Sequence, residues 1–176
     1  MNIRFAETKD VAKILDIVNY EILNTTVIYD YKERSYEYQL NWFEQKEQAN
    51  MPVIVAEIDG EVVGFGSYGI FRPWEAYKYS IEHSIYVSRE ARAKGVGKQL
   101  LTELITLAKA NGYHTMIAGV DASNAGSIAF HKQFGFVEIG IFKAVGYKFD
   151  TWLDLNFFTA YFKISILNKI TKVKDI

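Results

Sequence analysis

The segment from Ile81 to Ala108 constrains the fold more than any other part of the sequence. Residues 81–87 predict a strand, with Ile81, Ile85 and Val87 on one of its faces. A charged turn follows, and beyond it apolar residues recur at intervals of three and four, which predicts a helix with one buried face. The apolar residues of that face are Leu100, Leu101, Leu104, Ile105 and Ala108. A strand that leads through a turn into an amphipathic helix indicates a fold in which helices pack on a sheet.

The rest of the chain also alternates strand and helix patterns. Asp59-Gly60, a dipeptide typical of a two-residue hairpin turn, joins strand-like runs over residues 53–58 and 62–70. Thr8 and Ser35 are positioned to cap two helices, which end near residues 22 and 48. We further expect strands over residues 2–6, 116–120, 136–142 and 147–158, and a helix over residues 125–134. The pattern predicts a mixed α/β sheet with helices on its faces.

Length and composition bound the class of protein. The 176 residues predict one domain over residues 1–160 and a tail over residues 161–176, which forms a weak terminal helix or a frayed end. A net charge of −1 gives no reason to expect a nucleic-acid partner. The N-terminus lacks the apolar stretch of a signal peptide, and no apolar run is long enough to cross a bilayer. We therefore expect a cytoplasmic protein that does not bind membranes.

The cysteine and histidine content limits the kinds of catalytic and metal site that this chain can form. The chain contains no cysteine, which excludes a disulfide framework, a thiolate metal site and a cysteine acyl-enzyme. Its three histidines have no spacing typical of a zinc site, so no metal is predicted. Aromatic residues make up 15 % of the chain, which suits a deep pocket or a subunit interface as well as a thick core.

The turn over residues 92–98 is a candidate phosphate-binding site. A helix N-terminus exposes unpaired N–H groups and a partial positive charge, both of which attract phosphate. Gly95 and Gly97 allow the backbone to approach an anion closely. Four cations lie in or beside the turn: Arg89, Arg92, Lys94 and Lys98. The alternative is a tight loop at the start of a solvated, charged helix, and the turn alone does not decide between the two.

Two familiar phosphate-binding motifs are incomplete here. Leu100 stands where a dinucleotide-binding fingerprint has its third small residue, and Gln99 stands where a P-loop has Ser or Thr. Arg92-x-x-Gly95-x-Gly97, after an Ile-Tyr-Val strand, instead resembles the acetyl-CoA pyrophosphate motif of the GNAT N-acetyltransferase superfamily. A second block over residues 124–136, a helix followed by a Gly-Phe turn, is similar to that superfamily's second signature. The two blocks also match in order and separation.

A narrower resemblance covers residues 3 to about 158. Five segments look like phosphinothricin and methionine sulfoximine or sulfone N-acetyltransferases: residues 24–26, 72–74, 80–87, 116–119 and 146–155. The resemblance implies a mostly antiparallel sheet with a splayed pair of parallel strands, acetyl-CoA as cosubstrate, and a homodimer with its pockets near the interface. Ala93 and Asp150 depart from the family's pattern, which frequently has glycine there. We expect the loop to tolerate Ala93, and Asp150 to alter a turn near the pocket or the dimer contact.

Glu82 is the candidate general base. Strand alternation places Glu82, Ser84 and Tyr86 on one face and His83 on the other. An amino-acid amine is mostly protonated at neutral pH, and a carboxylate in the pocket can hold the ammonium and accept its proton. The resemblance implies this role, since the family's thioester lies near this strand. The alternative is a carboxylate at the strand edge that pairs with a nearby cation.

The resemblance also implies the contacts of acetyl-CoA. Backbone N–H groups near Tyr86 and Val87 are expected to bind the oxyanion, and Asn124 to bind the pantetheine arm or cap its own helix. His131 stands where many members of the superfamily have a tyrosine that protonates the thiolate; it either donates that proton or only contacts the cofactor. The expected cofactor-binding residues are Ile85, Tyr86, Val87, Arg92, Ala93, Lys94, Gly95, Val96, Gly97, Lys98, Asn124 and His131.

The expected acceptor is a small, glutamate-like amino acid. A guanidinium matches a carboxylate in a bidentate geometry. The family places its Arg-Pro-aromatic loop over the acceptor. The resemblance therefore assigns Arg72, Pro73 and Trp74 to the substrate site, together with Glu82. Tyr29 is expected to wall the pocket. With no thiol available as a nucleophile, direct transfer in a ternary complex is favoured. The alternatives are transfer to a protein N-terminus or a polyamine, and a CoA-binding sensor without turnover.

Overall fold

A seven-stranded sheet lies at the centre of the computed structural model, which describes residues 1–163. The strands lie in the order β1-β2-β3-β4-β5-β7-β6, and all neighbouring pairs are antiparallel except β4 and β5. Their bounds are Asn2–Phe5 for β1, Val53–Ile58 for β2, Glu61–Ile70 for β3, Ser80–Val87 for β4, Thr115–Asp121 for β5, Val137–Lys148 for β6 and Thr151–Tyr161 for β7. The predicted mixed sheet, mostly antiparallel with one parallel pair, is confirmed.

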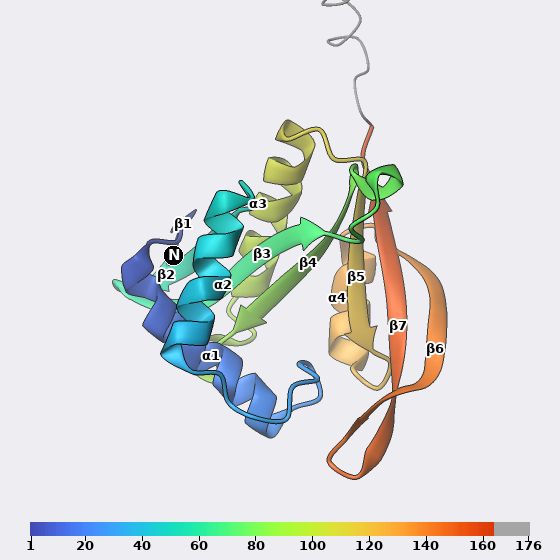
Figure 1. Ribbon diagram of the computed structural model, residues 1–176, viewed down its shortest axis with the longest axis horizontal. Coiled ribbons are helices and arrows are strands. Elements are labelled where there is room, and N and C mark those ends of the chain that lie inside the picture. Colours follow the sequence, from blue (N-terminus) through green and yellow to red (C-terminus); the bar gives the residue numbers. More distant parts are fainter. Residues whose placement is uncertain (164–176) are drawn as a thin grey trace, which may run out of the picture.

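Helices cover both faces of this sheet, as predicted. In Figure 1, α1 and α2 lie in front of β2 and β3, while α3 and α4 lie behind the sheet. The bounds are Val11–Asn24 for α1, Tyr36–Gln48 for α2, Val96–Ala110 for α3 and Ala125–Gln133 for α4. Three short 3₁₀ turns, η1 (Thr8–Asp10), η2 (Glu75–Tyr77) and η3 (Arg89–Ala91), precede α1, β4 and α3.

Local sequence signals explain where several elements begin. The Ser35 side chain accepts a hydrogen bond from the Tyr38 N–H and so caps α2. Asn124 caps α4 in the same way, through the Ser127 N–H at 2.9 Å. The β2–β3 hairpin turns at Asp59 and Gly60, both with positive φ, as a two-residue turn of the predicted kind requires. These three predictions are confirmed, whereas the predicted cap at Thr8 is wrong, because Glu7 takes the N-cap position of η1 and Asp10 that of α1.

Two hydrophobic clusters hold the helices to the sheet. On the α1 and α2 face, Ile14 and Ile22 of α1 pack with Phe65 of β3. On the opposite face, Leu100 and Leu104 of α3 are fully buried. Burial of one such side chain stabilises the fold by about 2 kcal/mol. Because both faces of β3 and β4 are covered, their positions are fixed by packing from two sides.

The parallel pair β4 and β5 separates soon after it forms. Its register joins only Ser80–Glu82 to Thr115–Ile117, although β4 continues to Val87 and β5 to Asp121. Figure 1 shows the two strands diverging beyond this point. The backbone edges that face each other across the fork therefore lack their usual strand partner.

The last two strands differ from the prediction. The strand expected over residues 136–142 continues to Lys148, and the strand expected over residues 147–158 begins only at Thr151. Phe149 and Asp150, with φ of 51° and 55°, form the hairpin turn between them. The sequence signal was missed because no glycine marks this turn, although Asp tolerates the left-handed region. Of the tail predicted over residues 161–176, all but the first three residues lie outside the described part of the chain, and the domain limit at residue 160 stays a prediction.

Candidate active site

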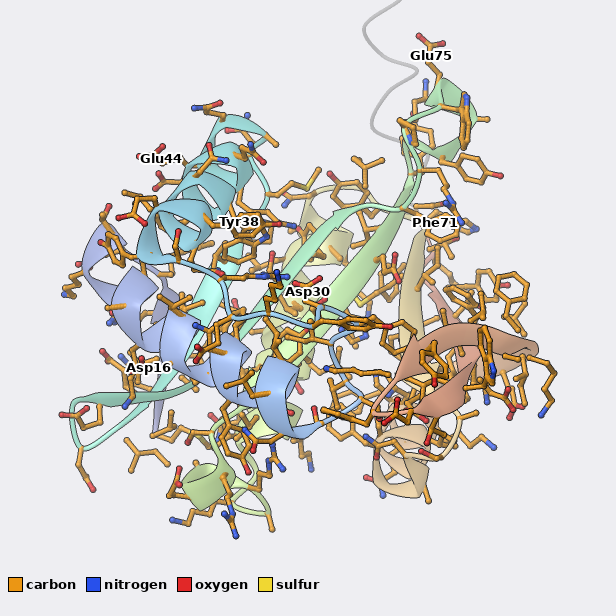
Figure 2. The ribbon with its side chains drawn as sticks, turned by 60° about the horizontal axis from the view of Figure 1, so that its bottom comes forward. Asp16, Asp30, Tyr38, Glu44, Phe71 and Glu75 are labelled. Atoms are coloured by element: carbon orange, nitrogen blue, oxygen red, sulfur yellow. The ribbon has the colours of Figure 1, made fainter. Side chains whose placement is uncertain are left out.

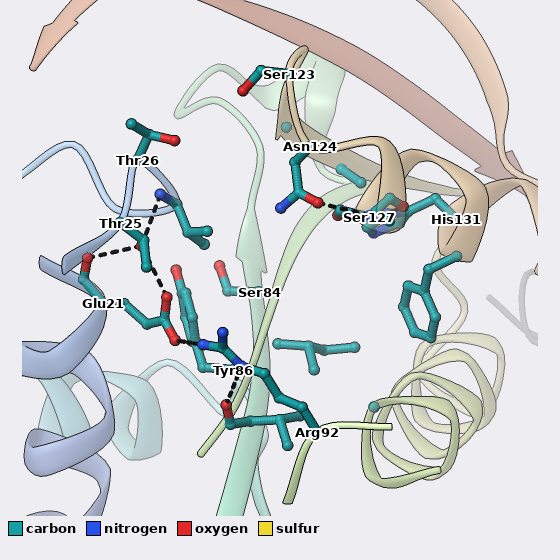
Figure 3. A pocket seen from close by; sticks show the side chains of 18 of the residues that line it. Glu21, Thr25, Thr26, Ser84, Tyr86, Arg92, Ser123, Asn124, Ser127 and His131 are labelled. Atoms are coloured by element: carbon teal, nitrogen blue, oxygen red, sulfur yellow. Dashed lines mark hydrogen bonds and ion pairs between the residues drawn. The ribbon is translucent and has the colours of Figure 1, made fainter. Parts of the chain in front are cut away.

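A cavity of about 1050 Å³ occupies the fork between β4 and β5 (Figure 3). Residues 84–87 of β4 form one wall, and Ala118 and Gly119 of β5 form another. One side of α4, from Gly126 to His131, and the turn before α3 close two further sides. This volume is at the upper end of the range for small-molecule and cofactor sites, so the fork accommodates a ligand between two strands that remain otherwise paired.

Eight of the twelve predicted cofactor-binding residues line this cavity: Ile85, Tyr86, Val87, Arg92, Ala93, Gly97, Asn124 and His131. The other four, Lys94, Gly95, Val96 and Lys98, are not part of its lining. The Val96 side chain is only 1 % exposed and belongs to the core around α3. Lys94, Gly95 and Lys98 are exposed at the start of α3.

The N-terminus of α3 has an arrangement suited to an anion. Gly95 occupies the N-cap position with φ of 80°, a conformation that favours glycine. The first backbone bond of the helix runs from the Gln99 N–H to the Gly95 carbonyl at 3.2 Å. The amides of Val96, Gly97 and Lys98 therefore have no acceptor within the helix, and they carry the positive end of its dipole. Ala93 also has a positive φ, 60°, which is costly for a residue with a Cβ.

Arg92 is held by a residue that sequence reasoning missed. Its guanidinium forms an ion pair with Glu21 of α1, whose side chain is 4 % exposed. The other carboxylate oxygen of Glu21 accepts a hydrogen bond from Thr25 Oγ1 at 2.9 Å, and Figure 3 shows this chain of contacts along the cavity. The available signal was a carboxylate on the apolar face of α1, beside Val18 and Ile22. Such a residue requires a charged partner when buried.

Glu82 lies where the β4–β5 pairing ends. Its Oε1 is 3.3 Å from the position that a Cβ on Gly119 would occupy, so it reaches toward the strand that borders the large cavity. Burial raises the pKa of Glu82, and the positive charge of Arg72 opposes that rise. Arg72 stacks on Phe71 with 5.0 Å between the guanidinium carbon and the ring centroid. A carboxyl group with a raised pKa beside a cavity is a candidate acid–base group.

His131 has one free ring nitrogen. Its Nδ1 lies 2.7 Å from the Ser127 carbonyl oxygen and donates to it, which leaves Nε2 as the acceptor in the neutral ring. This Nε2 is buried and has no hydrogen-bond partner among residues 1–163. Burial lowers the pKa of His131, so the neutral ring is favoured at pH 7.

His83 is a second buried histidine of the cavity that the sequence did not single out. Its ring centroid is 5.2 Å from that of His131, and both residues line the cavity. Neither ring nitrogen of His83 has a hydrogen-bond partner within the described chain. Burial lowers its pKa to about 3, with a smaller contribution from His131. The alternation of residues along the strand predicted which face of β4 carries His83, but it did not predict that His131 of α4 lies next to it.

The predicted acceptor residues of the β3–β4 connection lie outside the large cavity, whereas most of the predicted cofactor-binding residues line it. Arg72, Pro73 and Trp74 lie in the exposed connection between β3 and β4, whose 3₁₀ turn at Glu75 projects from the body in Figure 2. Trp74 is 65 % exposed and packs on Tyr77. None of these residues lines the large cavity.

Tyr29, the other predicted wall residue, lies between α1 and α2. A Cβ on Gly146 of β6 would come within 2.6 Å of its ring, so the absence of a side chain there makes room for it. Its hydroxyl is buried and unpartnered within residues 1–163. Tyr29 therefore packs against the β6–β7 hairpin and does not border the large cavity.

Residues 1–163 contain no group of three or more histidine, aspartate or glutamate side chains that could hold a metal ion. Over the same range, no helix combines the length and the apolar character needed to cross a membrane.

Comparison with known proteins agrees with the fold. Residues 17–136 match the model of the acetyltransferase (GNAT) family. A Salmonella typhimurium L-methionine sulfoximine/L-methionine sulfone acetyltransferase is 39 % identical over 157 residues, which cover 89 % of this chain and 92 % of the relative. Among solved structures, a ribosomal-protein-alanine N-acetyltransferase from Brucella melitensis is 42 % identical with a TM-score of 0.91, covering 92 % of this chain and all of that one. A phosphinothricin acetyltransferase from Sinorhizobium meliloti in complex with acetyl-CoA is 35 % identical with a TM-score of 0.89, covering 91 % of this chain and 87 % of that one.

Proposed function

This chain belongs to the acetyltransferase (GNAT) family, and from that membership we propose that it transfers the acetyl group of acetyl-CoA to the α-amino group of a small, glutamate-like amino acid. Phosphinothricin, methionine sulfoximine and methionine sulfone are the acceptors named by its relatives. The single observation that carries the proposal is the cavity between β4 and β5. The N-terminus of α3 borders this cavity at Gly97, and the Glu82 carboxylate reaches toward Gly119, which also lines it.

Acetyl-CoA is proposed to lie in the fork with its pyrophosphate at the start of α3. The amides of Val96 to Lys98 and the guanidinium of Arg92 would bind the phosphate oxygens, because both offer N–H donors and positive charge. The Asn124 side chain already accepts from the Ser127 N–H, and its own amide N–H₂ is available for the pantetheine arm. The unpaired edge of β4 near Tyr86 and Val87 would hold the thioester carbonyl.

Glu82 and His131 would carry out the proton transfers of the reaction. The acceptor ammonium must lose two protons as its nitrogen becomes an amide nitrogen, and the thiolate must gain one. Glu82 is proposed to take the first proton and release it to solvent. The free Nε2 of His131 would accept the second proton and pass it to the sulfur of the leaving thiolate. The absence of cysteine from the sequence favours direct transfer in a ternary complex.

A protein N-terminus is the second candidate acceptor, because the Brucella structure is named as a ribosomal-protein-alanine N-acetyltransferase. A peptide requires an open groove along which several residues extend. Glu82 lines a smaller cavity of about 130 Å³, a volume that suits a single small side chain and not several residues of a peptide. This confinement favours the free amino acid.

Thiol release from acetyl-CoA over a panel of acceptors tests these assignments. We expect the highest kcat/KM with methionine sulfone, methionine sulfoximine or phosphinothricin, and lower values with an alanine-terminated peptide or a polyamine. Glu82→Gln should lower kcat by about 10²- to 10⁴-fold while acetyl-CoA affinity is kept. Glu44→Gln, an exposed substitution on α2, is the matched control. If no amine in the panel causes thiol release, the result would support a CoA-binding sensor without turnover. An unchanged rate in Glu82→Gln would remove the base role.

We also propose that the chain forms a homodimer through β6 and works in the cytoplasm. β6 is an edge strand of the sheet, and most of its apolar side chains are exposed: Val137, Ile139, Ile141, Phe142, Val145 and Tyr147. An edge with this much exposed apolar surface is suited to bury itself against a second copy. Sedimentation should give twice the chain mass, and Ile139→Lys should reduce it to one chain mass, whereas Leu23→Lys should not.

A further inference from the structure

A second cavity lies beside Glu82 on the α1 and α2 face of the sheet. Its volume is about 130 Å³, and it shares Ser84 and Tyr86 with the large cavity, so only the side chains of β4 separate the two. Gln39 and Lys46 of α2 form its far wall, with Arg34 beside them. We call this space the α2 cavity.

The α2 cavity contains hydrogen-bond donors that lack acceptors. Gln39 is 1 % exposed, and its Oε1 accepts from Arg34 Nη1 at 3.4 Å, which fixes the orientation of the amide. Its Nε2 is buried and finds no partner in the described part of the chain. A buried amide donor without a partner destabilises the fold unless a ligand or a water satisfies it.

Lys46 adds a positive charge that forms no ion pair within residues 1–163, although the Glu82 carboxylate lines the same cavity. Its Nζ donates to the Tyr68 carbonyl oxygen at 2.8 Å, which uses one of three N–H groups. Burial lowers its pKa to about 8, which is the expected effect of enclosing an ammonium without a counterion. Together, Gln39 and Lys46 present donors to a ligand that brings oxygen acceptors.

The remaining walls of the α2 cavity include apolar side chains, beside the polar side chains of Ser67, Glu82 and Ser84. Val18 and Ile28 contribute aliphatic side chains, and Trp42 and Phe65 contribute rings in an edge-to-face pair with centroids 6.2 Å apart. These walls suit a methyl or methylene group, while the donors suit oxygens bonded to the same atom. A methyl-bearing sulfonyl, sulfoximine or phosphinate group combines both features within a small volume.

We propose that the α2 cavity binds the side-chain head group of the amino-acid acceptor, with Gln39 and Lys46 as the residues that determine specificity. This inference rests on the proposed function. The amine of the acceptor lies at Glu82, the α-carboxylate extends toward Arg72, and the oxygens on sulfur or phosphorus accept hydrogen bonds from Gln39 Nε2 and Lys46 Nζ. Selection follows because an analogue without these oxygens leaves both donors unsatisfied.

The test compares L-methionine sulfone with L-methionine, which has the same backbone and methyl group but lacks the sulfonyl oxygens. Gln39→Leu and Lys46→Met each remove one donor and keep similar volume. We expect each to lower kcat/KM for methionine sulfone by about tenfold to a hundredfold and to change that for methionine by less than about threefold. The Glu44→Gln variant on the same helix, labelled on the outer side of α2 in Figure 2, should leave both values unchanged.

The outcomes separate this inference from the proposed function. If wild-type protein releases no thiol with methionine sulfone, methionine sulfoximine or phosphinothricin, the proposed function fails. Suppose that wild-type protein acetylates methionine sulfone. If both variants then lower kcat/KM equally for the two substrates, or leave both values unchanged, the α2 cavity does not bind the head group. Should Gln39→Leu fail to fold, Gln39→Glu keeps the shape and replaces the donor by an acceptor, and it must then show the same selective loss.

Discussion

The carboxylate of Glu82 lies over Gly119: its Oε1 is 3.3 Å from the place that a Cβ on Gly119 would take. Leu155 and Phe157 of β7 lie 3.5 Å and 3.7 Å from the same point, so β5 has little room to yield in that direction. A glycine on the neighbouring strand thus allows the candidate base to reach the fork. Strand β4 supplies the carboxylate, and β5 supplies the space for it.

Gly119→Ala should therefore impair turnover without unfolding the protein. The added methyl group displaces the Glu82 carboxylate by a few tenths of an ångström, and misplacement of a catalytic group by this order lowers kcat/KM by about tenfold or more. Steady-state kinetics and a thermal melt give the two readouts. Glu44→Gln, the exposed substitution on α2, is the control, because it lies outside both cavities and the proposed dimer edge. Equal activity of the two variants would show that Glu82 does not depend on Gly119.

Arg72→Met should move the acid limb of the pH–rate profile to higher pH. Glu82 must be ionised to accept a proton, and burial raises its pKa, so kcat/KM falls as the pH drops through that raised pKa. The charge of Arg72 lowers the pKa of Glu82, and removing this charge raises it further. Initial rates from pH 5 to 9 check the shift, with Lys78→Met in the same connection as control. A limb that stays in place or moves to lower pH contradicts the assignment.

His83 should make the folded protein sensitive to acid. Its pKa is about 3 in the fold against 6.5 ordinarily, so below pH 6.5 the unfolded chain binds a proton that the folded chain does not. The free energy of unfolding then falls with pH by up to about 1.4 kcal/mol per unit. Between pH 7 and 5, His83→Gln should lose about 2 kcal/mol less than the wild type in urea unfolding. Phe136→Leu, which alters a ring packed on His83, should lower stability equally at both pH values.

Ala93→Gly should stabilise the turn before α3. Ala93 has φ of 60°, where the Cβ of an L-residue is crowded and glycine is not. Relief of this strain exceeds the greater flexibility that glycine gives the unfolded chain, and a gain of about 1 kcal/mol follows. Chemical unfolding measures it. Ala91→Gly, two residues earlier and buried with no positive φ, should instead destabilise the protein. A loss of stability in Ala93→Gly would show that the turn does not store this strain.

The sequence identified features that depend on neighbouring residues. Ser35 and Asn124 cap their helices, because a cap is formed by a side chain and an amide three residues away. The Asp59-Gly60 turn and the glycine-containing start of α3 were predicted for the same reason. The residue pattern did not predict the hairpin at Phe149 and Asp150, because its positive φ values come from the pairing of β6 with β7 and carry no glycine signal. Only the family resemblance indicated a turn at Asp150.

The sequence by itself determined the order of strands and helices, the phosphate-type turn and the presence of a carboxylate on β4, since each follows from spacing along a short stretch of chain. Only the tertiary structure decided that Glu82 reaches over Gly119, that Arg92 pairs with Glu21, that the rings of His83 and His131 lie side by side, and that Gln39 and Lys46 line the same small cavity as Glu82. These contacts join residues far apart in the chain. They depend on where β4 and β5 separate, and packing on both faces of the sheet fixes that point.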